Sequence, residues 1–220
     1  YRVFVRGRSL LFAGENRAAI TWCRKALAID PDMAPAWNVM ATCYGNLREP
    51  DSALAAYDQA FAHPERFPER GRLLALAGVA YLNGDLAGAL EAQERAVQLM
   101  PTVHTAYTNR SFYLMRAGRF SEALESARLA EKVSPFGPTQ PTLLNQFECL
   151  LLLGQAEEAR RIVPRLRGGR ALQAPMDIAA ATGQWVAAES LASVLLITPA
   201  ADDDVRGKAA TILSAAQASR

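Results

Sequence analysis

Hydrophobic residues recur along the chain at helical spacing, and glycine or proline interrupts them at regular points. Within residues 105–135 the apolar positions that share one helical face are Tyr107, Leu114, Ala123 and Ala130. Gly118 interrupts this pattern and Pro135 ends it. Glycine adopts the left-handed backbone that closes a helix, and proline cannot continue a helix because it lacks an N–H. The stretch therefore predicts two helices joined by a tight turn.

The same unit recurs through the chain, because a glycine is followed five residues later by an alanine again and again. The pairs are Gly14/Ala19, Gly84/Ala89, Gly118/Ala123, Gly154/Ala159 and Gly183/Ala188, with Arg48/Ala53 in the one gap. Repetition at a fixed period of 20–50 residues is typical of solenoids. We expect the alanines at helix crossings, where a small side chain lets two backbones approach.

The predicted organisation is a single domain over 1–220, made of six repeats and a capping helix. The repeats span approximately 1–33, 34–69, 70–103, 104–139, 140–168 and 169–200, and the capping helix spans 201–220. Pro64 and its neighbours predict an irregular joint, and Pro164 is expected to shorten a helix. Pro175 is expected to interrupt the first helix of the sixth repeat. Asp202, Asp203 and Asp204 suit the start of the capping helix, whose dipole favours acids.

These residues resemble the tetratricopeptide repeat. In the second unit the matching positions are Trp37, Ala41, Tyr44, Ala53, Tyr57 and Ala60, and in the fourth they are Tyr107, Gly118, Phe120, Ala123, Ala130 and Pro135. The resemblance implies an all-α fold, a right-handed superhelical solenoid of helix-turn-helix repeats. It also implies a concave groove lined by the first helix of each repeat.

Composition narrows the possible functions. Half of the 220 residues are hydrophobic and the formal net charge is +2, with basic residues scattered rather than grouped. We therefore expect neither a nucleic-acid partner nor membrane contact, since both need concentrated positive charge. The apolar run Cys149–Leu153 is too short to span a bilayer.

No combination of residues in the sequence indicates catalysis, a cofactor or a metal site. Cys23, Cys43 and Cys149 lack metal-ligand spacing, and we expect them to be apolar core residues in a reducing compartment. His63 and His104 have no nucleophile or carboxylate at a catalytic spacing, so we expect solvated histidines in or beside turns. We accordingly predict a protein that is not an enzyme.

Two functional hypotheses remain. The first is a protein-interaction module that holds a peptide, a helix or a neighbouring domain in the groove, and the second is a small-molecule-sensing regulatory domain that encloses its ligand. The opening stretch is similar to repeat regions of bacterial adenylate cyclases, winged-helix regulators and Ser/Thr kinases, which implies a regulatory part of a larger signalling protein. Because the sequence starts at Tyr1 rather than at methionine, we expect a piece of a longer, cytoplasmic protein, with a periplasmic location as the alternative. The partner and the oligomeric state stay open.

The resemblance also indicates which residues line the groove. Carried over position by position, the partner-binding residues are Asn38, Thr42 and Asn46, then Leu74 and Tyr81, then Thr108, Phe112, Met115 and Arg116. This set is mostly apolar or neutral, and it lacks the basic residues of a carboxylate clamp. We therefore expect the groove to bind an amphipathic helix or an extended apolar peptide. The alternative is that Tyr81 and Phe112 pack between neighbouring repeats.

Overall fold

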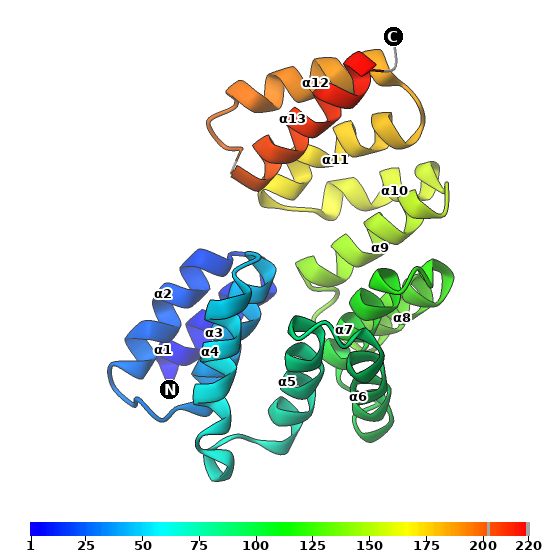
Figure 1. Ribbon diagram of the computed structural model, residues 1–220. Helices are drawn as coiled ribbons and strands as arrows, with labels where there is room; N and C mark the ends of the chain where they lie inside the picture. The colour runs from blue at the N-terminus through cyan, green and yellow to red at the C-terminus, as the bar shows by residue number, and fades with distance from the viewer. Residues whose placement is uncertain (202, 219–220) are drawn as a thin grey trace.

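The computed structural model describes residues 1–201 and 203–218, and Figure 1 shows that this part of the chain is helical throughout. The helices are α1 (Arg2–Phe12), α2 (Asn16–Leu27), α3 (Ala34–Asn46), α4 (Pro50–Phe61), α5 (Glu69–Leu82), α6 (Leu86–Leu99), α7 (His104–Arg116), α8 (Phe120–Val133), α9 (Gln140–Leu152), α10 (Ala156–Ile162), α11 (Gly168–Ala181), α12 (Trp185–Ile197) and α13 (Asp203–Ala218). Two short 3₁₀ helices, η1 (Pro64–Arg66) and η2 (Val163–Arg165), lie in the connections. The predicted all-α class is confirmed.

Consecutive helices pack as pairs, from α1 with α2 to α11 with α12, and the pairs stack along a curved path (Figure 1). The last helix, α13, packs against α11 and α12 at the end of the stack. Each pair therefore buries its apolar side mainly against the next pair, as in a solenoid.

The turns between paired helices repeat one backbone geometry. Gly118 has a φ of 74°, its N–H donates to the Met115 carbonyl at 3.1 Å, and the next N–H donates to the Leu114 carbonyl at 2.9 Å. Arg48 replaces glycine in the second pair, yet it has a φ of 60° and makes the corresponding bond to Gly45 at 3.1 Å. A non-glycine residue is strained in this region, so the turn is imposed on Arg48 by the packing of its two helices.

The alanines that follow the turns lie at the helix crossings. Ala53, Ala89, Ala123, Ala159 and Ala188 are all 0 % exposed. Any larger side chain there would force the paired helices apart, because the interior is close-packed. The predicted burial of these five residues is confirmed.

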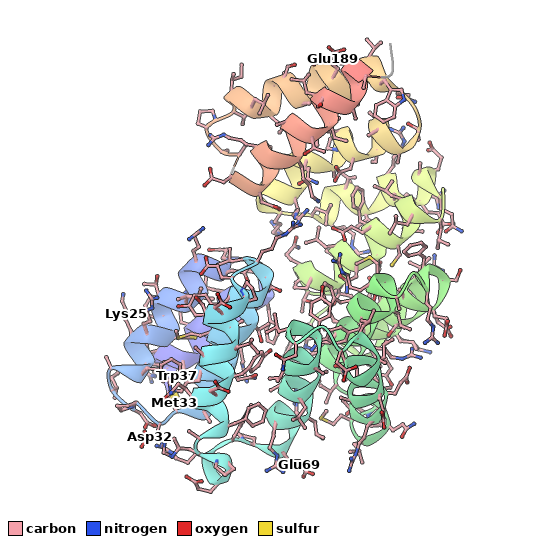
Figure 2. The ribbon with its side chains drawn as sticks, viewed as in Figure 1. Lys25, Asp32, Met33, Trp37, Glu69 and Glu189 are labelled. Carbon is pink, nitrogen blue, oxygen red and sulfur yellow. The ribbon has the colours of Figure 1, made fainter. Side chains whose placement is uncertain are left out.

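A second feature recurs in the second and fourth pairs. Trp37 Nε1 donates to the Pro31 carbonyl at 2.8 Å, and Tyr107 Oη donates to the Pro101 carbonyl at 3.1 Å. In each case an aromatic ring near the start of a first helix holds the preceding turn. Figure 2 shows Trp37 beside Met33 and Asp32 where α3 begins.

Two prolines in the C-terminal pairs predicted departures from the regular unit, and only the first of these departures is found. Pro164 lies in η2 and limits α10 to Ala156–Ile162, which confirms the shortened helix. The prediction that Pro175 interrupts its helix is wrong, because α11 is continuous through it. Pro175 is exposed while Ala174 and Met176 beside it are 0 % exposed, so packing on the buried face keeps the helix intact. Asp203 and Asp204 do lie in the first turn of α13, whereas Asp202 falls outside the described residues.

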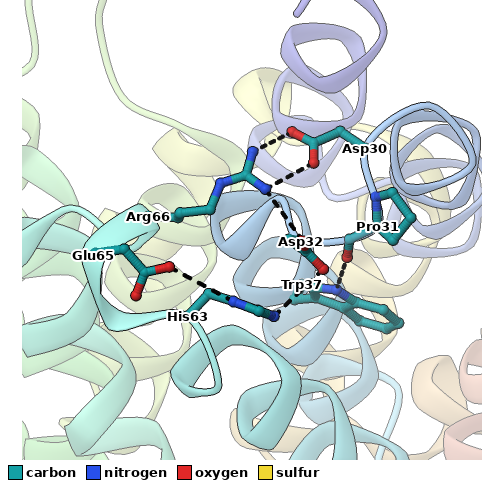
Figure 3. A network of polar contacts seen from close by, with 7 residues as sticks. All are labelled: Asp30, Pro31, Asp32, Trp37, His63, Glu65 and Arg66. Carbon is teal, nitrogen blue, oxygen red and sulfur yellow. Dashed lines mark hydrogen bonds and ion pairs between the residues drawn. The ribbon is translucent and has the colours of Figure 1, made fainter.

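The joint between α4 and α5 is irregular, as expected from its prolines. It contains η1, and its outer edge carries a network of charged side chains (Figure 3). Arg66 donates to both carboxylate oxygens of Asp30, at 3.0 and 2.6 Å, and lies 3.6 Å from Asp32. His63 lies 3.4 Å from Asp32 and 3.7 Å from Glu65. These contacts tie the α2–α3 turn to the α4–α5 connection.

Candidate functional site

The candidate site lies on first helices of successive pairs. We call the surface formed by these predicted residues the inner face. It consists of Asn38, Thr42 and Asn46 on α3, Leu74 and Tyr81 on α5, and Phe112, Met115 and Arg116 on α7. The α1 and α3 helices contact each other, and so do α3 and α5. Rings from α5 and α7 meet as well, since Tyr81 and Phe112 have centroids 5.3 Å apart. The structure thus brings the three groups of predicted residues onto adjoining helices.

The α3 part of the inner face is polar. The Thr42 hydroxyl donates to the Asn38 carbonyl one turn earlier at 3.0 Å, so the helix itself occupies that hydroxyl. Asn46 is exposed, and its Nδ2 donates to Oδ1 of Asn16 at 2.9 Å. Asn38 is half-buried. The side-chain amides of Asn38 and Asn46 can each both donate and accept hydrogen bonds, which suits the backbone of a bound peptide.

The α5 and α7 part is aromatic. Tyr81, Phe112 and Tyr113 form a three-ring cluster, with centroids 5.3 to 5.5 Å apart and tilted or edge-to-face geometry. Tyr113 is buried, which raises the pKa of its phenol, whereas Tyr81 and Phe112 are half-buried. The two half-buried rings therefore pack between neighbouring pairs and also keep part of their surface free. The two interpretations, a partner-binding surface and packing between neighbouring repeats, therefore each describe part of the surroundings of Tyr81 and Phe112.

Three further predicted residues differ in their surroundings. Thr108 is 7 % exposed, and its hydroxyl lies 2.8 Å from that of Thr142, so it belongs to the contact between α7 and α9. Met115 is half-buried, with Sδ 3.9 Å from Sγ of Cys149. Arg116 is exposed at the end of α7. We therefore leave Thr108 out of the inner face, because it has little surface to offer a partner.

Two residues that the sequence analysis did not place on this side also meet here. Phe12 ends α1 and His104 begins α7, and their rings lie 5.6 Å apart in an edge-to-face arrangement. His104 lies beside a turn as expected, but it is half-buried rather than fully solvated, and this burial lowers the pKa of its imidazole, which the nearby Arg70 lowers further. A signal for Phe12 was available in the sequence. It stands two residues before Gly14, as Arg116 stands two residues before Gly118.

The three cysteines do not have the surroundings of reactive thiols. Cys23, Cys43 and Cys149 are buried and free, as predicted for core residues. Burial raises the pKa of Cys23 and Cys149 to about 11 and that of Cys43 to about 12, so these thiols stay protonated and unreactive at neutral pH. Across residues 1–201 and 203–218, no group of three histidine, cysteine or acidic side chains could hold a metal ion. Within those same residues, none of the helices combines the length and apolarity needed to cross a membrane.

Two of the cavities at the surface of the described residues lie away from the inner face. One of about 300 Å³ lies between α8 and the α9–α10 turn, where Leu124, Arg128 and Glu158 line it. The other, of about 200 Å³, lies between α5 and α6 and is lined by Leu73, Leu76 and Glu91 among others. None of the residues of the inner face lines either cavity.

No family model matches the sequence, and no curated protein does either. Solved structures do match the fold along the chain. A thermophilic tetratricopeptide protein of Thermus thermophilus, TTC0263, is 21 % identical with a TM-score of 0.64, over 82 % of this chain and 99 % of that one. A tetratricopeptide repeat protein of Parabacteroides merdae is 11 % identical with a TM-score of 0.60, over 98 % and 83 %. The chain has the tetratricopeptide-repeat fold.

PilF of Pseudomonas aeruginosa is also similar, at 19 % identity and a TM-score of 0.53, over 100 % of this chain and 96 % of that one. Identities this low establish the fold and nothing about the partner. The predicted resemblance to tetratricopeptide-repeat proteins is thereby confirmed for the fold.

Proposed function

We propose that the chain is a non-catalytic protein-interaction module that binds an amphipathic helix or an extended apolar peptide on its inner face. The observation that carries the proposal is the pair of half-buried rings, Tyr81 and Phe112, next to the partly accessible Met115. Aromatic side chains that are already fixed by packing lose little entropy on binding and supply much of the affinity in such grooves.

The polar residues at the two ends of the inner face would orient the ligand. Asn38 and Asn46 offer amide donors and acceptors beside the apolar centre, and Arg116 offers an exposed cation at the end of α7. A peptide with apolar residues on one side and an acidic residue near one end matches this arrangement.

The wider context is also part of the proposal. A protein or peptide ligand is favoured over nucleic acid, because basic residues are scattered along the sequence. It is favoured over an enclosed small molecule, because the centre of the inner face presents half-buried rings rather than convergent polar groups. We place the module in a regulatory part of a larger bacterial signalling protein in the cytoplasm.

Selection from a random peptide library on the immobilised protein tests the proposal, followed by titration calorimetry with the enriched peptides. We expect enriched peptides to be amphipathic and to lose about tenfold or more in affinity for Arg116→Glu, since charge reversal repels an acidic end. Phe112→Glu should weaken binding further. The drop in melting temperature of Phe112→Glu relative to the wild type measures how much the Phe112 ring contributes to the packing of the fold.

The matched control is Arg161→Glu, which reverses an exposed arginine on α10, away from the inner face. It should bind the peptides as the wild type does. Peptides that bind Arg116→Glu and Phe112→Glu at wild-type affinity would contradict the proposed site, and a library that yields no binder would contradict the proposed function.

A further inference from the structure

The contact between Phe12 and His104 joins residues that lie three helix pairs apart. Phe12 comes from the first pair and His104 from the fourth, and their ring centroids are 5.6 Å apart. Next to it the α1–α2 turn approaches α9, because a Cβ placed on Gly14 would lie 3.8 Å from Cβ of Gln140.

This contact completes a ring of first helices. The α1 helix contacts α3, α3 contacts α5, the rings of Tyr81 and Phe112 join α5 to α7, and His104 joins α7 back to α1. The inner face belongs to α3, α5 and α7, three of the four helices in this ring. The Phe12–His104 contact therefore joins α7, which carries part of the inner face, back to the first pair.

The contact is weakly held. Nδ1 of His104 is buried without a hydrogen-bond partner among the described residues, and water would satisfy this atom if the contact opened. Arg70 adds a positive charge near the same imidazole. Phe12 is half-buried and does not belong to the buried apolar cluster that runs through the first two pairs to α5, so the ring is not needed to hold the first two pairs together.

The connection between α4 and α5 provides a place for the movement. Direct contact between these helices is sparse compared with that between α2 and α3 or between α8 and α9. It centres on the Tyr57 ring, whose Cζ would lie 2.9 Å from a Cβ on Gly78, and on Phe61 against Phe67. Phe67, Ala75 and Val79 also pack in the apolar cluster of the first two pairs. The network of Arg66 and His63 with carboxylates, whose side chains are 30 to 68 % exposed, completes the joint.

We propose that the Phe12–His104 contact is a latch that holds the solenoid closed over its inner face, with the α4–α5 joint as the hinge. Opening swings the first two pairs away from α7 and α9 and gives a ligand access along α3, α5 and α7. The regulatory part of this inference rests on the proposed function of the inner face, whereas the latch and hinge do not.

Distances between paired spin labels test the latch without any partner. Ser9→Cys on α1 and Ser121→Cys on α8 introduce exposed label sites, and the three native cysteines are buried. We expect one narrow, short distance distribution for the labelled wild type. Phe12→Ala should shift it to a longer and broader distribution, while the control Phe136→Ala, which removes a ring that is 99 % exposed, should leave it unchanged.

Phe12→Ala could lengthen the distance by unfolding α1 rather than by opening the contact. His104→Ala is the second variant for this reason, because it removes the same contact from the α7 side. His104→Phe, which keeps an aromatic ring there, should retain the short distance. If His104→Ala keeps wild-type helix content and the wild-type distance distribution, the latch is contradicted, whatever Phe12→Ala does.

The regulatory part has its own test, with the peptides that bind the wild type. If the closed form is populated at about 90 %, removing the latch should tighten peptide binding by up to about tenfold, because the competent fraction rises. Unchanged affinity in a latch variant whose label distances lengthen would contradict the regulation and leave the hinge standing. A protein that binds no peptide would defeat the proposed function, and the label distances would still decide the latch.

Discussion

Two joints in the solenoid are held together by different physical means. Between the fourth and fifth pairs the contacts are buried hydrogen bonds: the Thr108 and Thr142 hydroxyls lie 2.8 Å apart, and Asn145 Nδ2 donates to the Thr108 carbonyl at 2.9 Å. Gln146 Nε2 donates to the Ala127 carbonyl at 3.3 Å. Buried bonds of this kind fix register, because each unpaired partner would pay the cost of desolvation.

The joint between the second and third pairs depends instead on apolar contacts, such as those of Tyr57 and Phe67, and on surface charges. Arg66 and Asp30 form a bidentate pair, yet both side chains stay partly exposed, and water and salt screen such pairs. A solenoid with one repeated unit can thus have a stiff joint, here between the fourth and fifth pairs, and a compliant joint, here between the second and third pairs. Which joint is stiff depends on whether its polar groups are buried.

The largest expected effect is at the ring contact of the compliant joint. Gly78→Ala places a methyl group against the buried Tyr57 ring, so the α4–α5 crossing must spread, and we expect a loss of about 1–3 kcal/mol in unfolding free energy. The control is Gly45→Ala on α3, where no atom lies within 4 Å and the helix should gain stability, by up to about 1 kcal/mol. Denaturant melts of both variants check this, and equal stabilities would show that the two helices do not meet at Gly78.

A smaller effect is expected at the stiff joint. Thr142→Val keeps the side-chain shape but removes the hydroxyl that pairs with Thr108 and with Thr139, while Thr108 retains its bond to the His104 carbonyl. We expect a loss of about 1 kcal/mol in a denaturant melt. Thr21→Val, at an exposed hydroxyl on α2, is the matched control and should change stability much less. A Thr142→Val protein as stable as wild type would remove the distinction between the joints.

The smallest effect is expected from the surface network. Arg66→Gln should lower the melting temperature slightly at low salt and not at all at high salt, since screening already weakens the wild-type pair. A salt-independent difference between the two proteins would contradict this account.

Acid should act on the same network. The hydrogen bond from Arg66 lowers the pKa of Asp30 below its ordinary value of 3.8. A lowered carboxyl pKa means that the stabilisation is present above the ordinary value and is lost as the pH falls through the lowered value. The difference between wild type and Arg66→Gln should therefore vanish in strong acid, and thermal melts from pH 6 to pH 2 check it.

Local chemistry made much of the fold predictable. A turn needs a residue that tolerates positive φ, as Gly118 does, and a helix crossing needs a small side chain, as Ala123 has. Each requirement is met by a single residue type and can therefore be recognised in the sequence. Arg48 was placed correctly in a turn by its spacing alone, and the structure gives it the left-handed backbone that glycine adopts elsewhere. Pro175 was misjudged because tertiary packing on one side of α11 outweighs the missing N–H.

The contacts between distant pairs could not be predicted in the same way. How α1 lies relative to α7 depends on the angles added up at three joints, and a small change in one connection moves Phe12 far from His104. The sequence predicted an irregular joint around Pro64, but not how far this joint turns the stack. The residues of the inner face could be predicted one helix at a time, whereas the Phe12–His104 contact between distant helices could not.

Amide hydrogen exchange followed by mass spectrometry tests the central contrast most directly. We expect peptides from α8 and α9 to exchange most slowly and peptides covering residues 60–70 to exchange faster, because exposed ion pairs protect the α4–α5 connection less than buried hydrogen bonds protect the stiff joint. We further expect added salt to accelerate exchange at residues 60–70 and to leave α8 and α9 unchanged. Equal protection of the two joints, with no salt effect at either, would contradict this contrast.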